Sequence, residues 1–268
     1  MLKDITIGQY FPGNSFIHRM DPRFKIICTL LFIVTLFAGS SIWTLVIGGV
    51  FVVLMLALSR IPFGLIWKSV KPILPILVFT GLLNLVFVGD DNVLWEWKFI
   101  KITMGGIQTS VFMVVRIVLL IVGSSLLTYT TSPILLTDAI ESLMSPLKKV
   151  RFPVHEMAMM MSIALRFIPT LIEETDKIMS AQKARGASLD NGGVMERIRA
   201  LIPILVPLFV SAFRRAEELA TAMECRCYRG GEGRTRLRQL CAKPGDYIGF
   251  GVSLLFMAAS VTVNILLK

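Results

Sequence analysis

The chain has 268 residues, of which 54% are hydrophobic, and a formal net charge of +10. With a mean hydropathy of +0.72, the chain is too apolar for an ordinary soluble domain, and this composition indicates a polytopic membrane protein. An excess of Lys and Arg is typical of the cytoplasmic segments of such proteins. Aromatic residues are not interleaved with the basic ones, so the charge does not indicate nucleic-acid binding.

The chain begins with about 25 polar, turn-rich residues that lack the apolar core and cleavage site of a signal peptide. Arg23 and Lys25 directly precede an apolar run, which predicts a cytoplasmic N-terminus by the positive-inside rule. As one helix the uncharged run at residues 26–59 would be about 50 Å long, against a hydrocarbon core of about 30 Å. A break at residues 39–41 predicts two short or tilted crossings with a tight outer turn; one long tilted helix is the alternative.

A third crossing is predicted from about residue 73 to residue 88. Arg60, Lys68 and Lys71 precede it and mark a return to the cytoplasm. Three prolines near its start favour an irregular or interfacial segment. The segment 89–92, which contains Asp90 and Asp91, and the tryptophans that follow it are typical of an outer loop at the membrane surface.

A fourth crossing is predicted from about residue 106 to residue 128, and it contains Arg116. An arginine well inside the bilayer is costly, so such residues usually face the helix bundle or a partner. The alternative is that Arg116 lies near the end of a tilted helix and extends its side chain to the interface. Residues 1–131 thus form an N-terminal membrane region with about four crossings.

Residues 132–243 are predicted to form a cytoplasmic domain, because they hold 17 of the 28 Lys and Arg residues and their apolar residues recur at amphipathic helical spacing. A helix is expected over residues 132–149. Two long helices follow, separated by a turn-rich linker at residues 188–193. Residues 244–268 form a last crossing and place the C-terminus outside. The predicted fold is all-α, with about five transmembrane helices and a cytoplasmic domain containing two long helices.

The two long helices end on a shared pattern, in which an alanine stands four residues before an arginine. Ala181 precedes Arg185 in this way, and Ala222 precedes Arg226. The first ends in Ala184-Arg185-Gly186 and the second in Cys225-Arg226-Cys227. One interpretation is a cation that stabilises the C-terminal helix dipole, worth about 0.3–1 kcal/mol. The other is a helix end whose small flanking residues let the guanidinium enter a groove and bind a buried carboxylate through two hydrogen bonds.

The first long helix also carries a group of methionines near its start: Met157, Met159, Met160 and Met161. Packing within the same chain is the simplest interpretation. Methionine is also the flexible, polarisable residue of surfaces that repack against more than one partner, so this group is a candidate interface. We do not expect copper ligation by the thioethers.

The cysteines do not indicate a disulfide framework, since three of the four lie in the segment assigned to the reducing cytoplasm. Cys225 and Cys227 are two residues apart without a second pair of ligands, which argues against zinc. We expect no metal or cofactor on this chain. The sequence lacks a phosphate-binding Gly-x-x-x-x-Gly-Lys-Ser/Thr loop and the HExxH and GxSxG motifs, so we do not expect an enzyme.

In combination, several motifs resemble the transmembrane (T) component of energy-coupling factor (ECF) transporters, importers of vitamins and trace metals driven by a pair of ABC-type ATPases. The resemblance covers nearly the whole chain and rests on Gly8-Gln9-Tyr10, Pro12-Gly13, residues 18–23, Thr131-Ser132-Pro133, residues 166–170, residues 181–186 and residues 214–230. In that family two Ala-Arg-Gly-like motifs end the two coupling helices, and each arginine docks into one ATPase. Here the second motif departs from the pattern, as Cys225-Arg226-Cys227, but keeps an arginine between small residues.

The resemblance implies a non-catalytic subunit of the cell membrane whose partner ATPases bind ATP and Mg²⁺. Movement of the ATPases would pass from Arg185 and Arg226 along the long helices to a membrane-embedded substrate-binding (S) component, with the methionines in the sliding interface. A T component dedicated to cobalt or nickel import is the alternative within the family. Outside it, a stand-alone secondary transporter would need charges near the bilayer centre, where only Arg116 lies, and a repeat between membrane halves.

Overall fold

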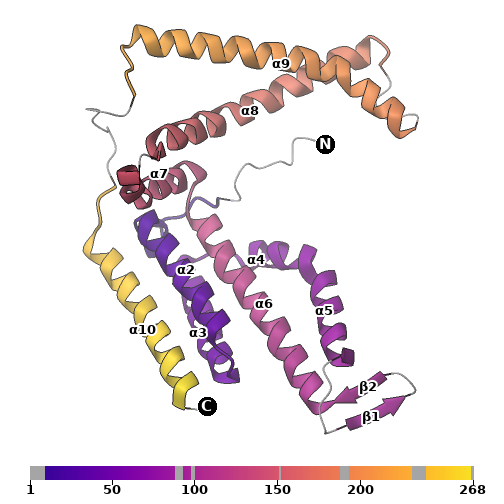
Figure 1. Ribbon diagram of the computed structural model, residues 1–268, viewed down its shortest axis with the longest axis vertical. Helices are drawn as coiled ribbons and strands as arrows, with labels where there is room; N and C mark the ends of the chain where they lie inside the picture. The colour runs from indigo at the N-terminus through magenta and orange to yellow at the C-terminus, as the bar shows by residue number, and fades with distance from the viewer. Residues whose placement is uncertain are drawn as a thin grey trace. The chain divides into compact units, whose positions relative to one another are not determined.

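The computed structural model describes residues 10–87, 93–97, 100–150, 152–187, 193–230 and 240–266. Nearly all of its elements are α-helices, which confirms the predicted all-α class (Figure 1). The chain divides into two compact units. We call residues 8–139 with 240–268 the membrane unit, and residues 140–239 with 1–7 the long-helix unit. The proposed cytoplasmic boundaries at residues 132 and 243 stay a prediction, because contacts and not a membrane define these units.

The first apolar run forms two helices, α2 (Pro22–Ala38) and α3 (Ile42–Ser59), as the break at residues 39–41 predicts. Gly39 is the C-cap of α2, and the hydroxyl of Ser41 accepts a hydrogen bond from the amide of Trp43 at the start of α3. At 17 residues, α2 spans about 25 Å, near the lower limit for a transmembrane helix.

Four segments of the described chain are long and apolar enough to cross a membrane. They are α3, the segment Phe63–Phe87, α6 (Met104–Thr130) and α10 (Pro244–Leu266). They account for four of the about five predicted crossings, and α2, at 17 residues, lies where the remaining one is predicted. The chain is therefore a multi-pass membrane protein.

The segment Phe63–Phe87 is bent, in agreement with the irregular start that its prolines predict. A short helix, α4 (Phe63–Val70), leads through the 3₁₀ turn η1 (Lys71–Ile73) into α5 (Leu74–Phe87). Figure 1 shows α4 lying across the direction of α5. Pro72 lies inside the turn, where its missing amide hydrogen and fixed φ favour a break in the helix.

The segment between α5 and α6, predicted to be an outer loop, contains a hairpin that the sequence did not predict. Strands β1 (Val93–Trp97) and β2 (Ile100–Thr103) pair in antiparallel fashion, with Trp97 opposite Ile100. Aromatic and β-branched residue types favour strands, which gives a physical reason for the hairpin. The predicted acidic loop at residues 89–92 lies outside the described residues.

The core of the membrane unit is mostly aliphatic and contains a group of phenylalanine rings. The rings of Phe32, Phe51 and Phe256, from α2, α3 and α10, have centroids 4.6 to 5.9 Å apart. Such pairs contribute about 0.5–1.5 kcal/mol each beyond the burial of their area. The last helix of the chain therefore packs against the first two crossings.

Arg116 faces the helix bundle, which decides between its two interpretations. Its guanidinium donates a hydrogen bond to the carbonyl of Gly39 and lies 4.4 Å from the centre of the Phe112 ring. Carbonyls at a helix C-terminus lack partners within the helix and attract cations. Arg116 thus stabilises the end of the short helix α2 from the middle of α6.

The long-helix unit consists mainly of α8 (Val154–Ala184) and α9 (Val194–Cys225). Before them, α7 (Pro133–Leu143) and the 3₁₀ segment η2 (Ser145–Val150) replace the single helix predicted over residues 132–149. Most of the predicted linker, residues 188–192, lies outside the described residues. α8 and α9 are antiparallel, so their C-terminal ends point in opposite directions (Figure 1).

Candidate functional site

α8 ends in a Schellman motif. The amides of Gly186 and Ala187 donate to the carbonyls of Lys183 and Gln182, both over 3.0 Å. Gly186 has a φ of +87°, the left-handed conformation that this motif needs and that glycine adopts without strain. Arg185 is the C-cap residue immediately before it, and its side chain is exposed.

α9 ends in the same motif. The amides of Cys227 and Tyr228 donate to the carbonyls of Glu224 and Met223, over 2.8 and 3.0 Å. Cys227 occupies the position of Gly186 and has a φ of +56°. Arg226 follows the last residue of its helix as Arg185 does, and it is also exposed. The two arginines therefore occupy the same position at two helix ends that have the same backbone hydrogen bonds.

We expect Cys227→Gly to stabilise the end of α9 by about 0.5–1 kcal/mol. The left-handed conformation costs a residue with a Cβ roughly 1–2 kcal/mol, which glycine avoids. Glycine loses more backbone entropy on folding, and this loss offsets part of the gain. Hydrogen exchange of the amides at residues 227 and 228 would slow. The matched control is Cys225→Gly, inside the helix, which should speed the same exchange; faster exchange in Cys227→Gly would contradict the assignment.

A polar contact joins the two long helices. The carboxylate of Glu174 in α8 accepts hydrogen bonds from the hydroxyl of Ser211, over 2.8 Å, and from the guanidinium of Arg215, both in α9. These two bonds lower the pKa of Glu174. Nearby, the side-chain amide of Gln182 donates to the carbonyl of Pro203 over 3.3 Å. We call the contact of Glu174, Ser211 and Arg215 the helix latch.

The ion pair of the helix latch, Glu174 with Arg215, lies equally far along the chain from the two arginines at the helix ends. Residues 174–185 in α8 and residues 215–226 in α9 are segments of equal length, each about 16 Å long at 1.5 Å per residue. Because the helices are antiparallel, the two arginine-bearing ends extend from the latch in opposite directions (Figure 1).

The lowered pKa of Glu174 predicts how the helix latch responds to acid. The ordinary glutamate value is 4.5, so the stabilisation by the carboxylate is fully present above pH 4.5. It is lost only as the pH falls through the lower value of the folded protein. We expect the distance between spin labels on α8 and α9 to stay constant down to pH 4.5 and to increase below it. Glu173→Gln is the control and should not alter this profile; separation already near neutral pH would contradict it.

Three of the four candidate methionines are exposed on one side of α8. Met157, Met160 and Met161 are 44%, 60% and 54% exposed, and their spacing puts them on one helix face. Met159 is half-buried. Packing within this chain therefore accounts for Met159 and leaves the other three available to a partner.

α9 carries a longer apolar face that the sequence analysis did not identify. Its members are exposed and recur every three or four residues: Ile198, Ile202, Leu205, Phe209 and Phe213. Residues with this spacing lie on one face of a helix, so the apolar face could have been predicted from the sequence. The sequence could not show that α8 leaves this face uncovered.

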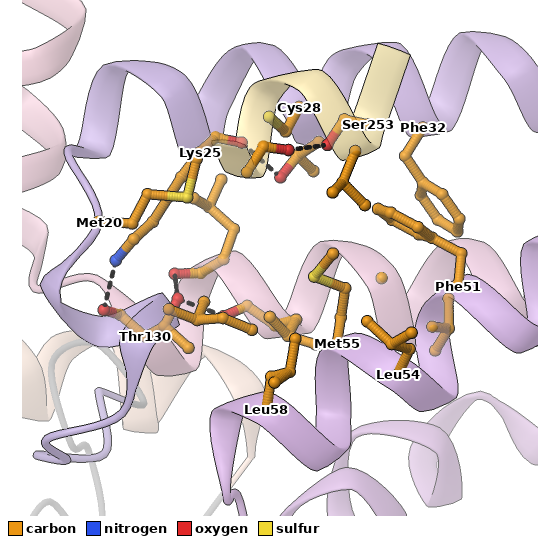
Figure 2. A pocket seen from close by; sticks show the side chains of 18 of the residues that line it. Met20, Lys25, Cys28, Phe32, Phe51, Leu54, Met55, Leu58, Thr130 and Ser253 are labelled. Carbon is orange, nitrogen blue, oxygen red and sulfur yellow. Dashed lines mark hydrogen bonds between the residues drawn. The ribbon is translucent and has the colours of Figure 1, made fainter. Parts of the chain in front are cut away.

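The membrane unit contains a cavity of about 200 Å³ between α1 (Phe16–Arg19), α2, α3, α6 and α10. Apolar side chains dominate its wall, among them Phe32, Phe51, Leu54 and Leu58 (Figure 2). Lys25 stands at one end. The cavity was not predicted, since no local pattern reports the space between distant helices.

All three protons of the Lys25 ammonium are used within the protein. They are donated to the carbonyls of His18 and Thr130, over 3.3 and 3.0 Å, and to the hydroxyl of Thr131, over 3.2 Å; Figure 2 shows the bond to Thr130. The side chain is only 6% exposed. Lys25 therefore supports the fold and leaves no donor for a charged ligand in the cavity.

The carboxylate of Asp246, near Lys25, links the N-terminal and C-terminal parts of the membrane unit by hydrogen bonds. Asp246, at the start of α10 and 3% exposed, accepts hydrogen bonds from the amides of Asp21 (3.0 Å) and Lys243 (2.7 Å). Asp246 and Asp21 both act electrostatically on Lys25. We call Lys25, Asp21 and Asp246 the buried charge cluster, which joins α2, α6 and α10.

The described part of the chain brings no three His, Cys, Asp or Glu side chains close enough together to hold a metal ion. All four cysteines are free thiols, and Cys225, Cys227 and Cys241 are exposed. The thiols on either side of Arg226 are thus accessible parts of the helix end.

Comparison with known proteins shows similarity along nearly the whole chain. Residues 13–237 match the family model described as CbiQ, Cobalt transport protein. Curated relatives bear the name energy-coupling factor transporter transmembrane protein EcfT. The relative from Ruminiclostridium cellulolyticum is 52% identical over 257 residues, 96% of each chain. That from Clostridium kluyveri is 50% identical over 99% of this chain and 98% of its own, and that from Bacillus subtilis 48% over 97% of both.

Proposed function

This chain belongs to the family of transmembrane components of energy-coupling factor transporters, and from that premise we propose that α8 and α9 couple it to two ATPase subunits. The observation that carries the proposal is the pair of equivalent helix ends. Arg185 and Arg226 stand at the same position of the same Schellman motif and are both exposed. Two such ends pointing in opposite directions suit two docking grooves, one on each ATPase.

Each arginine supplies a guanidinium group that a groove on a partner would recognise. A guanidinium binds a carboxylate through two parallel hydrogen bonds, and its geometry is set by the helix end that carries it. The flanking residues Ala184 with Gly186, and Cys225 with Cys227, are small enough to enter a groove with it. Docking at both ends would connect the two ATPases through this chain.

The chemistry of ATP belongs to the partners in this proposal. The two ATPase subunits bind ATP and Mg²⁺ and hydrolyse ATP, while this chain is non-catalytic. When the ATPases close, they move the helix ends. The helix latch of Glu174, Ser211 and Arg215 holds α8 to α9, so a displacement of one end is transmitted to the other helix.

A substrate-binding S component is the third partner. Its contact surface would be the exposed methionine face of α8, Met157, Met160 and Met161, with the apolar face of α9. Unbranched, polarisable methionine side chains suit a surface that slides or repacks. The relatives are named for energy-coupling factor transporters in general, which favours this assignment over an importer dedicated to cobalt or nickel. We propose a vitamin as the transported substrate.

The proposed orientation follows from the distribution of charge. The N-terminus and residues 132–243 would face the cytoplasm, where the ATPases and ATP are, and the C-terminus would lie outside. The protein would act in the cell membrane.

Co-purification tests the proposal. The full chain is expressed with a candidate pair of ATPases and S components, extracted in mild detergent and purified through a tag on this chain. Recovery of both ATPases, and vitamin uptake by vesicles only when ATP is supplied, is the expected result. Uptake by this chain alone would instead indicate a self-sufficient transporter.

A further inference from the structure

α4 and its flanks carry three exposed cations: Arg60, Lys68 and Lys71. Their side chains form no hydrogen bond or ion pair with any other residue in the described ranges. No acid is near in sequence either, since none lies between Asp21 and Asp90. This region of the membrane unit therefore has a local positive charge that the chain does not neutralise.

The same short helix exposes two aromatic side chains. Phe63 and Trp67, one helical turn apart, are 74% and 52% exposed, whereas Ile66 is 7% exposed and faces the protein. Aromatic side chains, tryptophan above all, are typical of the boundary between acyl chains and headgroups. α4 thus combines an apolar edge with cations, the composition of a helix that lies in the membrane surface.

Contacts with α6 place α4 beside the last turn of that helix. The hydroxyl of Tyr129 donates to the carbonyl of Leu65 over 3.0 Å and accepts from the hydroxyl of Ser69. α6 has 27 residues and is about 40 Å long, so its ends extend beyond a hydrocarbon core of about 30 Å. Tyr129 is in its last turn, and α4 lies across the direction of α5 there (Figure 1).

We propose that α4 is an interfacial helix that binds anionic phospholipid headgroups through Arg60, Lys68 and Lys71, with Phe63 and Trp67 between the acyl chains. The ammonium groups and the guanidinium supply hydrogen-bond donors and charge for lipid phosphates. A free phosphate would satisfy the cations but not the exposed rings, so a lipid fits both halves of the surface. Each cation near an anionic membrane strengthens association about fivefold at low salt.

Tryptophan fluorescence gives a direct test, because Trp67 is the one tryptophan on α4. Trp43, Trp95 and Trp97 are replaced by phenylalanine, and the full chain is placed in nanodiscs with bromine-labelled lipids that quench Trp67 on contact. Labelled phosphatidylglycerol should quench more than labelled phosphatidylcholine at the same mole fraction. Lys68→Gln with Lys71→Gln should lower this preference about fivefold for each lysine removed.

Three controls isolate the headgroup contact. Lys148→Gln with Lys149→Gln removes the same charge from η2 and should leave the preference unchanged. Lys68→Arg with Lys71→Arg should retain it. In the protein with both lysines, the preference should shrink as salt shortens the Debye length from ~10 Å at 0.1 M to ~3 Å at 1 M, a measurement that does not depend on the folding of any lysine variant.

Two results would overturn the proposal. One is equal quenching by the two lipids at low salt, and the other is a preference that the glutamine variant keeps in full. Absence of quenching by either lipid, a third such result, would place Trp67 outside the acyl chains.

Discussion

Arg185→Glu combined with Arg226→Glu is expected to abolish co-purification of both ATPases with this chain. Loss of one partner from a buried, hydrogen-bonded charge pair costs about 2–5 kcal/mol in association. Two such losses, with repulsion added, lower the affinity about a thousandfold or more. Both arginines are exposed in the isolated chain, so the thermal unfolding midpoint should not change.

The matched control for the double reversal is Lys183→Glu with Arg229→Glu. Both residues are exposed cations near the same two helix ends, and the change in net charge is identical. This variant should keep both ATPases. If it loses them as well, general electrostatic attraction and not docking of the two arginines holds the complex. If the double reversal keeps them, the contact lies elsewhere in the long-helix unit.

Lys25→Met is expected to destabilise the membrane unit by about 3–5 kcal/mol, the range observed when one member of a buried charge pair is removed. Three hydrogen bonds are lost, two of them to the backbone carbonyls of His18 and Thr130. Asp246, buried at the start of α10, loses the cation that offsets its charge. The measurement is the thermal unfolding midpoint of the full chain in detergent.

Lys71→Met serves as the control for Lys25→Met, because Lys71 is exposed and has no side-chain partner among the described residues. Its effect should stay within about 0.5 kcal/mol. Adding Asp246→Asn to Lys25→Met should cost less than the sum of the single changes, since both belong to one cluster. An unchanged midpoint in Lys25→Met would show that the buried charge cluster does not hold α2, α6 and α10 together.

Local patterns were sufficient to predict most helices and their ends, although the helix predicted over residues 132–149 is divided into α7 and η2. The length of an apolar run and the residues that interrupt it act within a few turns of the chain. Gly39 and Ser41 therefore divide the first run into α2 and α3, and Gly186 ends α8 in a left-handed turn. The β1–β2 hairpin was missed because its two short strands gain stability from pairing with each other, which composition does not reveal.

The sequence by itself thus determined the class of the chain, its multi-pass character and the two arginine-tipped helices. Only the tertiary structure decided which polar groups meet. Asp21 and Asp246 form a hydrogen bond although they are 225 residues apart. Arg116 binds the carbonyl at the end of α2, a helix that lies much earlier in the chain. Glu174 of α8 binds Arg215 of α9. Helical periodicity shows that a residue shares a face with its neighbours, but not which other helix covers that face. That choice depends on the packing of all helices at once.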